Sequence, residues 1–329
     1  AMLEFRNVVF QYDSEDFNII DGLSFHLEKG EFVSVIGPSG SGKSGLIRSI
    51  NGLERPDSGE LTVNGIDMMA KKVDTRKLAS EVAMVFQDAL AALNPTMTVG
   101  KQIMENLLYH RKMSKKEAKA RAVELLRMVG IPQPESRVDQ YPHEFSGGMR
   151  QRVVIAIAVA CNPQILICDE PTTALDVTIQ AQILELLKEM RVKYNLTIIL
   201  ITHDLGVVAN IADRIVVMYA GQIVERGTSI EVFHHPRHPY TNALLEAVPR
   251  LDLQNKQQLA SIEGTPPDLI APPKGCPFCT RCKYCMEICC EQQPPVLNFG
   301  DGHEASCWLY QLETPAADAP FTQEAHYEG

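Results

Sequence analysis

Hydrophobic and polar residues alternate along the N-terminal part of the chain, as they do in β-strands with one buried face. Residues 3–10 alternate in part, and residues 22–27 alternate again. Residues 32–37 form an apolar run that ends in a glycine-rich stretch, residues 61–65 form a short run closed by an Asn-Gly turn, and residues 81–86 form another apolar run. The pattern predicts a strand in each of these five segments.

Helical spacing of apolar residues begins where the glycine-rich stretch ends. It predicts a helix over residues 44–52 and continues over the well-charged segment 98–130. Residues 151–161 predict a buried helix, which an Asn-Pro pair stops. A further helix fits residues 241–248, within a segment that is otherwise broken up by proline.

Strands and helices alternate between these last two helices. Residues 165–168 and 197–202 predict apolar strands, with a helix between them over residues 178–194. Residues 215–220 and 222–225 predict a hairpin-like pair around a glycine. Apolar strands that alternate with helices are typical of an α/β fold with a parallel sheet covered on both faces.

The composition is that of a globular protein with a sizeable core. The chain has 329 residues, of which 45% are hydrophobic and 22% charged. At roughly 150 residues per domain, this length predicts two domains or one large domain with an appendage. The longest apolar run, residues 153–161, is about half of the roughly 18 residues that a membrane-spanning helix needs. The N-terminal residues lack the layout of a signal peptide, so we expect the chain on the cytoplasmic side of any membrane.

The balance of charge is acidic. The formal net charge is −10 at pH 7, from 31 Lys and Arg against 41 Asp and Glu. An acidic surface repels nucleic-acid backbones, so nucleic acid is not expected as a partner. Small anions remain possible ligands, because a local ring of backbone amides can hold phosphate on an acidic protein.

The glycine-rich stretch fits G-x-x-x-x-G-K-[ST], a motif that binds nucleotide phosphates when it follows a strand and opens a helix. Glycine lets the backbone wrap phosphates with its N–H groups, Lys43 can reach the β- and γ-phosphates, and Ser44 can ligate Mg²⁺. The alternative, a simple glycine-rich turn, is disfavoured by the strand and the helix on either side. The predicted phosphate-binding residues are Gly37, Pro38, Ser39, Gly40, Ser41, Gly42, Lys43 and Ser44.

Two adjacent acids supply the second half of this site. Asp169 and Glu170 follow the apolar strand over residues 165–168, and open α/β sheets place their ligands at this end of their strands. Asp169 can hold the Mg²⁺ shell. We interpret Glu170 as the group that polarises the attacking water, because a second carboxylate beside Asp169 is unfavourable and has no structural need. The alternative, two solvated acids at a strand end, is disfavoured because the phosphate motif is present in the same chain.

Other motifs resemble those of the ATP-binding-cassette (ABC) ATPases. Residues 144–152 resemble the signature loop of that family, through Ser146, Gly147 and Gly148. The other matching positions are Gln87 for the Q-loop, Asp176 for the D-loop, His203 for the switch histidine and Tyr12 for an aromatic residue that stacks on adenine. The order and spacing agree from residue 3 to about residue 230.

The resemblance implies roles for these residues. It implies a head-to-tail pair of ATPase subunits, in which each signature loop covers the ATP held by the other subunit. His203 would contact the γ-phosphate and orient the water beside Glu170. Gln87 would sense Mg²⁺ and transmit closure to a membrane partner through the helical segment 88–160. ATP then closes the pair and hydrolysis releases it, which is a ligand-driven shift of population.

A narrower resemblance is to the ATPases of dipeptide, oligopeptide and nickel importers. It is carried by residues 84–88 and 93–95, by residues 169–178, by the His-Pro-Tyr-Thr segment 238–241, and by residues 263–267. It implies two separate membrane permease subunits and, indirectly, an extracellular substrate-binding protein. The second ATPase is either another copy of this chain or a paralogue.

Two positions depart from the importer pattern. Ala89 stands where a proline usually follows Gln-Asp, and Gly45 stands where threonine usually follows the serine of the phosphate motif. A glycine early in a helix costs up to about 1 kcal/mol relative to alanine. Neither change removes a group that performs chemistry.

Most cysteines crowd into one segment near the end of the chain: Cys276, Cys279, Cys282, Cys285, Cys289, Cys290 and Cys307. In a cytosolic protein such crowding indicates a metal or iron–sulfur site rather than disulfides. The segment resembles the C-terminal motif of the same importers, in which four cysteines bind a [4Fe-4S] cluster. Matched by position, the implied ligands are Cys276, Cys282, Cys289 and Cys307.

The nature of this site and its ligand set stay open at this stage. Four thiolates suit tetrahedral zinc as well as a cluster, and a C-x₂-C-x₂-C-x₂-C run also resembles a ferredoxin motif that would include Cys279 and Cys285. We expect a structural role, because metal–thiolate bonds could order a Pro-rich segment that has few apolar residues to bury.

These observations predict an α/β fold with a P-loop core, an antiparallel β subdomain, a helical subdomain and a small Cys-rich extension. We expect a nucleotide-binding domain over residues 1–235, the extension over residues 236–312 and a disordered tail over residues 313–329. The resemblance implies that ATP hydrolysis powers import of di- and oligopeptides at the cytoplasmic face of the cell membrane. One alternative is the same role for nickel or another chelated solute. The other is a soluble ABC ATPase that acts on DNA or ribosomes, which the single cassette and the negative charge disfavour.

Overall fold

The computed structural model describes residues 1–11, 17–209, 211–247, 262–267 and 272–311 of the chain. The tail over residues 313–329 and the aromatic residue Tyr12 lie outside the described residues. Within the described ranges, no helix combines the length and the apolar character that crossing a membrane requires.

Strands and helices follow the α/β pattern that the sequence predicts. The strands are β1 (Leu3–Gln11), β2 (Asn18–Leu27), β3 (Phe32–Ile36), β4 (Ser58–Val63), β5 (Ile66–Asp67), β6 (Val82–Val85), β7 (Ile165–Asp169), β8 (Thr197–Ile201), β9 (Arg214–Tyr219), β10 (Gln222–Thr228), β11 (Val296–Asn298) and β12 (Glu304–Ser306). The α-helices are α1 (Lys43–Ile50), α2 (Thr75–Glu81), α3 (Ala89–Ala92), α4 (Val99–Arg111), α5 (Lys115–Met128), α6 (Pro134–Arg137), α7 (Gly147–Val159), α8 (Val177–Tyr194), α9 (Leu205–Val208), α10 (Ser229–His234), α11 (Pro239–Glu246) and α12 (Glu287–Glu291).

The larger sheet has the order β11-β12-β10-β9-β3-β8-β7-β6. Its strands β9, β3, β8, β7 and β6 are parallel, whereas β10, β12 and β11 are added antiparallel at one side. Because the carboxyl ends of the parallel strands share one edge of the sheet, the loops that follow them are brought together there.

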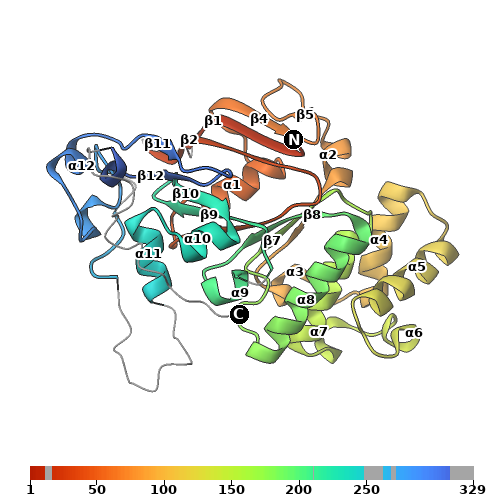
Figure 1. Cartoon of the computed structure of the whole chain (residues 1–329). Helices are drawn as coiled ribbons and strands as arrows, with labels where there is room; N and C mark the ends of the chain where they lie inside the picture. Colours follow the sequence, from red (N-terminus) through yellow and green to blue (C-terminus); the bar gives the residue numbers. More distant parts are fainter. Residues whose placement is uncertain (12–16, 210, 248–261, 268–271, 312–329) are drawn as a thin grey trace, which may run out of the picture.

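The smaller sheet is antiparallel and has the order β2-β1-β4-β5. Its turn between β4 and β5 places Asn64 at φ +44° and Gly65 at φ +73°, which confirms the Asn-Gly turn. Figure 1 shows α1 between this sheet and the larger one. Apolar residues of α1 belong to the same buried cluster as residues of both sheets.

The parallel strands are covered on both faces, as their continuous apolar sequences predict. Along β8, Ile198 and Leu200 belong to the buried cluster that includes the helices, and Ile199 and Ile201 belong to the cluster around the antiparallel sheet. Successive side chains of a strand point to opposite faces, so one apolar run supplies both cores.

The helical part of the chain differs in detail from the prediction. The predicted helix over residues 98–130 is two helices, because Lys112 adopts a left-handed φ of +52° and Ser114 caps α5 in a capping box with Glu117. Helix α7 begins four residues before the predicted residue 151, because the side chain of Ser146 accepts a hydrogen bond from Met149 N and starts the helix there. Helices α4, α5 and α6 lie on the side of the molecule away from the Cys-rich segment (Figure 1).

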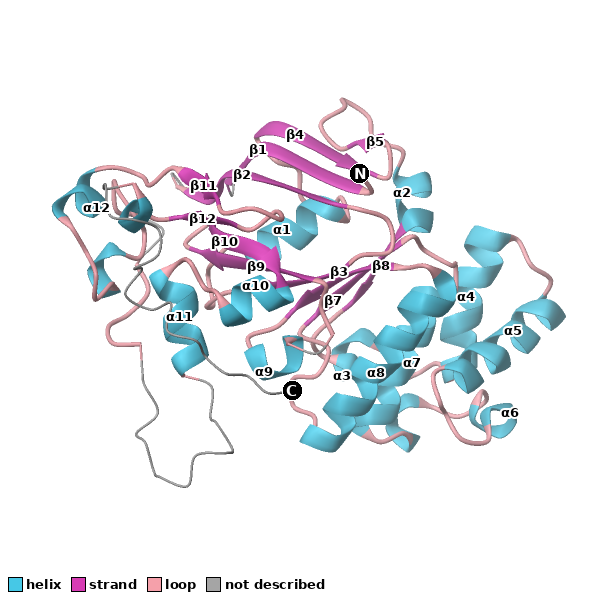
Figure 2. Cartoon of the chain, in the orientation of Figure 1, coloured by secondary structure: helices cyan, strands magenta, loops and turns pink. Residues whose placement is uncertain are grey.

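The C-terminal segment joins the larger sheet, which the sequence did not predict. Strand β12 pairs with β10, and β11 pairs with β12 (Figure 2). The segment also buries apolar surface: Phe278 is 2% exposed, and its ring centroid lies 5.3 Å from that of Tyr219 in β9. Burial therefore helps to order this segment, in addition to any bound metal.

Candidate active site

Four neighbouring parallel strands bring the predicted chemistry to one edge of the larger sheet. The phosphate loop follows β3, His203 follows β8, Asp169 ends β7 with Glu170 directly after it, and Gln87 follows β6. Segments from four distant parts of the sequence thus form one site at the carboxyl end of the sheet, which is where open α/β sheets bind ligands.

The phosphate loop runs from Gly37 to Ser44 in the first turn of α1. Two of its glycines are required by close packing. A Cβ atom at Gly37 would lie 2.4 Å from the carbonyl oxygen of Met218, and a Cβ atom at Gly42, which has φ +93°, would lie 2.6 Å from that of Ile19. The loop can therefore pass close to β9 and β2 and lead into the N-terminus of α1, where backbone N–H groups favour an anion.

Lys43 folds back over this loop. Its Nζ atom donates hydrogen bonds to the carbonyl oxygens of Gly37 and Pro38, each at 2.7 Å. Partial burial lowers the pKa of Lys43, and the carboxylates of Glu170 and Asp169 act in the opposite direction. The ammonium group is thus held at the loop and close to the two acids.

Asp169 and Glu170 occupy different environments although they are adjacent. Burial raises the pKa of Asp169, and the charge of Glu170 raises it further, whereas Lys43 and Arg48 lower it. Glu170 adopts a left-handed φ of +44°, which is uncommon for a residue other than glycine. A turn follows, in which the N–H of Thr173 donates to the carbonyl oxygen of Glu170 at 3.2 Å.

Three side chains meet the carboxylate of Glu170. Gln87 Nε2 donates to its Oε2 atom at 3.0 Å, and Thr173 Oγ1 donates to the same atom at 3.0 Å. His203 Nδ1 lies 3.3 Å from its Oε1 atom. The sequence indicated Gln87 and His203, but we did not predict Thr173 from it. Its position three residues after Glu170 was the one feature of the sequence that could have indicated this contact.

The signature residues start helix α7. Ser146 caps this helix, and Gly147 and Gly148 form its first turn. A Cβ atom at Gly148 would lie 2.6 Å from Cγ2 of Ile179, so glycine allows α7 to pack closely on the start of α8. None of the hydrogen bonds of the described residues joins these three residues to Lys43 or Glu170.

Asp176 caps helix α8. Its side chain accepts a hydrogen bond from the backbone N–H of Ile179 at 3.0 Å, and Ala174 before it has φ +65°. The D-loop is therefore a tight turn that links the turn after Glu170 to the helix on which the signature residues pack.

The two departures from the importer pattern have structural explanations. A Cβ atom at Gly45 would lie 3.1 Å from Cδ1 of Phe10 and 3.4 Å from Cγ2 of Ile19, so the strands β1 and β2 pack directly on α1. Ala89 is the first residue of α3, which the side chain of Asp88 caps. Proline is favoured at this helix position because its missing N–H is not needed there, and alanine serves equally well.

The cysteines gather on the C-terminal segment. Burial raises the pKa of Cys276 and of Cys307 to about 12 each, and both thiols also interact electrostatically with Cys282 and Cys289. A Cβ atom at Gly275 would lie 2.2 Å from the carbonyl oxygen of Cys289, so glycine allows these two chain segments to touch. In the part of the chain that the structure describes, no group of three or more His, Cys, Asp or Glu side chains could hold a metal ion. The iron–sulfur cluster and the zinc alternative thus stay predictions.

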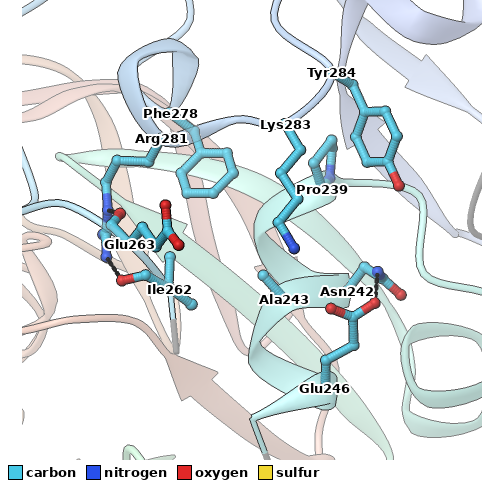
Figure 3. Close-up of a pocket in the computed structure, with 10 residues that line it drawn as sticks. All are labelled: Pro239, Asn242, Ala243, Glu246, Ile262, Glu263, Phe278, Arg281, Lys283 and Tyr284. Carbon is cyan, nitrogen blue, oxygen red and sulfur yellow. Dashed lines mark hydrogen bonds between the residues drawn. The ribbon is translucent and has the colours of Figure 1, made fainter. Parts of the chain in front are cut away.

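Arg281 ties this segment to the rest of the molecule. It donates to the carbonyl oxygens of Glu263 and Ile262, each at 2.9 Å, and to the hydroxyl of Tyr219 at 3.1 Å. Figure 3 shows Arg281, Ile262 and Glu263 among the residues that line a pocket between α11 and the Cys-rich loop.

A second tie is fully buried. His303 Nε2 lies 2.8 Å from Oε1 of Glu225, whose carboxylate also accepts from the backbone N–H groups of Arg237 and His238. His303 precedes β12 and Glu225 lies in β10, so this contact holds the added strand on the sheet.

Two family models match the chain. The model described as ABC transporter matches residues 20–173, and the model described as oligopeptide/dipeptide transporter, C-terminal region, matches residues 224–289. The first match contains the phosphate loop, Gln87, the signature residues and both acids. Together with the fold and the site, it defines the chain as an ABC ATPase, an enzyme that hydrolyses ATP.

Similar proteins narrow this class. The chain is 52% identical to the oligopeptide transport ATP-binding protein OppD of Bacillus subtilis, over 97% of this chain and 92% of that protein. It is 47% identical to the dipeptide transport ATP-binding protein DppD of Escherichia coli, over 92% of this chain and 94% of that protein. The chain therefore belongs to the ABC ATPases of the oligopeptide and dipeptide transporter family.

Solved structures agree with this assignment. The dimeric, post-hydrolysis structure of the ATP-binding cassette MJ0796 bound to ADP and Pi matches with a TM-score of 0.63 and 31% identity, over 69% of this chain and 99% of that chain. CbiO1 of Clostridium perfringens, part of the transporter complex CbiONQ, matches with a TM-score of 0.64 and 30% identity, over 70% of this chain and 90% of that chain.

Proposed function

We propose that the chain is the ATP-hydrolysing subunit of an importer of di- and oligopeptides, at the cytoplasmic face of the cell membrane. The observation that carries this proposal is the similarity to peptide-transport ATPases along nearly the whole chain, the C-terminal region included. The permeases that form the channel would be two separate membrane subunits, and an extracellular substrate-binding protein would deliver the peptide to them.

The phosphate loop and Lys43 would bind the triphosphate of ATP. Lys43 would exchange its hydrogen bonds to Gly37 and Pro38 for hydrogen bonds to the β- and γ-phosphate oxygens. Ser44, Asp169 and Gln87 supply oxygen donors of the kind that Mg²⁺ prefers, so these residues fit the ion. The ion, when bound, neutralises charge on the β- and γ-phosphates.

Glu170 would act as the general base. Its carboxylate interacts with Lys43, and Glu170 directly follows β7, the neighbour of the strand β8 that precedes His203. A carboxylate held in place by Thr173 and Gln87 can accept a proton from water as the water attacks the γ-phosphate. His203 would orient that water through its contact with Glu170 and would bind the γ-phosphate with its other nitrogen.

The signature residues would act on the ATP of a second subunit. Ser146, Gly147 and Gly148 present a hydroxyl and the backbone N–H groups of the first turn of α7, and no hydrogen bond described above connects them to the site of their own chain. A head-to-tail pair would place them on the γ-phosphate of the other subunit, where Asp176 would also lie. Tyr12 would stack on adenine.

The importer role can be tested with the intact membrane assembly. The chain is purified together with the membrane proteins that accompany it and is reconstituted into vesicles with its binding protein. ATP-dependent uptake of labelled di- and oligopeptides is expected, with uptake lost in a Glu170→Gln assembly. Uptake of chelated nickel but not of peptides would contradict the proposed peptide cargo. Purification of the chain without any permease would contradict the importer role.

We also propose that Cys276, Cys282, Cys289 and Cys307 hold a [4Fe-4S] cluster. Every pair among these four thiols interacts electrostatically. A cluster takes one thiolate at each of four irons, and these four interacting cysteines supply that number of ligands. A bound cluster would supply thiolate–iron bonds that cross-link and stabilise the Cys-rich segment.

The cluster has a direct test. Protein purified without oxygen should be brown and should contain roughly four iron atoms per chain. A colourless protein with one tightly bound zinc per chain would show that the site binds zinc and not a cluster. This test is independent of the ATPase site, whose residues all precede the Cys-rich segment in the sequence.

We further propose that the chain divides near residue 235 into the nucleotide-binding domain and the Cys-rich extension, with a helical subdomain over residues 88–160. The first family match ends at residue 173, before this division, and the second begins at residue 224 in β10, also before the division, and continues into the extension to residue 289. The extension depends on the cassette, because β12 uses β10 as its partner strand.

A further inference from the structure

The seven clustered cysteines interact electrostatically across the whole group, and three of them are distinguished by hydrogen bonds between their thiols. The four thiols proposed as cluster ligands interact with one another without hydrogen bonds between them. The other three are Cys279, Cys285 and Cys290, and hydrogen bonds do join these thiols. Cys290 is the central member, because it contacts both of the others.

Cys285 and Cys290 form a close and accessible pair. Their Sγ atoms lie 3.8 Å apart, and both residues are exposed. Cys279, Cys276, Cys289 and Cys307 are buried by comparison. Reagents in solution can therefore reach this pair first.

The backbone around the pair can bring the two sulfurs together. Cys285 lies in a turn in which its N–H donates to the carbonyl oxygen of Cys282, and Cys290 lies in the five-residue helix α12. A disulfide bond is roughly 2 Å long, so the sulfurs need to approach by about 2 Å, which side-chain rotation and a small shift of this short helix can supply.

We propose that Cys285 and Cys290 form a thiol–disulfide exchange site for low-molecular-weight disulfides such as glutathione disulfide, separate from the four-thiol set. The thiolate of one cysteine attacks a sulfur of the small disulfide, forms a mixed disulfide and releases one small thiolate. The thiolate of the other cysteine then attacks the protein sulfur of the mixed disulfide and releases the second small thiolate. Two protein thiols are oxidised to one disulfide, the small disulfide is reduced to two thiols, and the two protons pass to the released thiolates.

The position of the pair gives the exchange a structural consequence. The turn from Cys285 to Cys290 carries Cys289, whose carbonyl oxygen accepts a 2.7 Å hydrogen bond from the N–H of Cys276. A disulfide across the base of this turn closes a short loop around Cys289 and restricts its backbone. Exchange at the pair thus changes the rigidity of a segment that carries Cys289, one of the four proposed cluster ligands.

The test uses the full-length protein, purified without oxygen in its metal-loaded form. It is treated with glutathione disulfide, the remaining thiols are alkylated, and the protein is cleaved after glutamate, which separates Cys285 from Cys290 at Glu287. The expected result is a loss of two thiols per chain and a pair of peptides joined by Cys285–Cys290, which dithiothreitol separates. Cys285→Ser and Cys290→Ser should each abolish the joined peptides.

Cys279→Ser is the matched control, because it removes the third thiol of the set and leaves the pair. It should form the same disulfide as the unmodified chain. A Cys279–Cys290 disulfide, mixed glutathione disulfides without a joined peptide, or no loss of thiols would each overturn the proposal. The proposal would also be overturned if the purified protein held zinc and each of the three serine variants lost it, because these cysteines would then be metal ligands. Iron content, measured on the same samples before treatment, reports on the cluster separately.

Discussion

Gln87 donates a hydrogen bond through its Nε2 atom to Oε2 of Glu170, over 3.0 Å. The two residues follow neighbouring parallel strands, β6 and β7, so the sheet itself holds them together. An amide side chain has one donor group and one acceptor atom, and this contact uses only the donor. Gln87 can therefore keep Glu170 in place while its oxygen is free to bind a cation, which connects the two roles proposed for these residues.

Glu170→Gln should bind ATP and nearly stop hydrolysis. Glutamine keeps the size of the side chain but cannot accept a proton from water, and general bases contribute roughly 10²- to 10⁴-fold to a rate. Phosphate release is measured on the assembled ATPase, and ATP affinity is measured on the same preparation. Glu105→Gln, an exposed change in α4, is the control and should hydrolyse ATP normally. Hydrolysis by Glu170→Gln at the normal rate would remove Glu170 from the proposed mechanism.

Asp169→Asn should make the nucleotide-free protein more stable while it weakens binding of Mg²⁺ and ATP. Burial raises the pKa of Asp169, so its charge opposes folding at neutral pH. Because the group is partly exposed, we expect a gain of about 0.5–1 kcal/mol in the free energy of unfolding after allowance for solvent screening. Thermal or urea unfolding without nucleotide measures it.

The gain from Asp169→Asn should depend on pH in a defined direction. A carboxyl whose pKa is higher in the folded state loses its unfavourable charge when it is protonated. The difference between variant and unmodified chain should be constant above the raised pKa of the folded state. It should shrink as the pH falls through that value and vanish below the pKa of the unfolded state. A difference that grows on acidification would contradict the burial of this charge.

The sequence predicted the strand edge of the site well, because its chemistry lies in short contiguous motifs. The phosphate loop, the acid pair, Gln87 and His203 each follow an apolar strand, and parallel strands order such motifs at one edge. The position of Thr173 could not be predicted in the same way. Its hydroxyl meets Glu170 because Glu170 takes a left-handed conformation, and no residue pattern in the sequence specifies that conformation.

Gly148→Ala and Gly147→Ala form a matched pair with opposite outcomes for stability. Alanine is favoured over glycine in a helix by up to about 1 kcal/mol, so Gly147→Ala should be neutral or stabilising, since its Cβ atom would lie an ordinary 3.6 Å from Leu175. At Gly148 the Cβ atom would lie 2.6 Å from the stiff, β-branched Ile179, so the variant should lose roughly 1–3 kcal/mol. Urea unfolding of both variants checks the contrast, and equal effects would show that α7 does not pack on α8 in this way.

The C-terminal segment was the least predictable part of the fold. Strand β12 has three residues, too few for an alternating pattern, and it is placed by its pairing with β10 and by the buried contact between His303 and Glu225. These are contacts between positions far apart in sequence. Periodicity within a segment carries no information about them, and the many prolines obscured the remaining signal.

Phe278→Ala should loosen the Cys-rich segment without affecting ATP binding. The ring packs against Tyr219 and Tyr240, with centroids 5.3 and 5.4 Å away. Removing such a buried ring costs roughly 3–5 kcal/mol of stability. We expect a short segment that loses this much to detach from β9 and α11 more often. Limited proteolysis should cut this segment at least several times faster, whereas Val296→Ala, at a side chain that is 65% exposed, should leave the rate unchanged. Equal rates in both variants would show that other contacts hold the segment.

Serine replacements should divide the seven cysteines into two groups by iron content. Cys276→Ser, Cys282→Ser, Cys289→Ser and Cys307→Ser should each lose most of roughly four iron atoms per chain, because a hydroxyl is a poor ligand for this cluster. Cys279→Ser, Cys285→Ser and Cys290→Ser should keep the iron, since these three thiols form hydrogen bonds with one another. The four variants that lose iron should also unfold at lower temperature, because metal–thiolate bonds would no longer hold the segment. Loss of iron from Cys279→Ser or Cys285→Ser would instead support the ferredoxin-like ligand run, and normal iron in all seven variants would place the metal elsewhere.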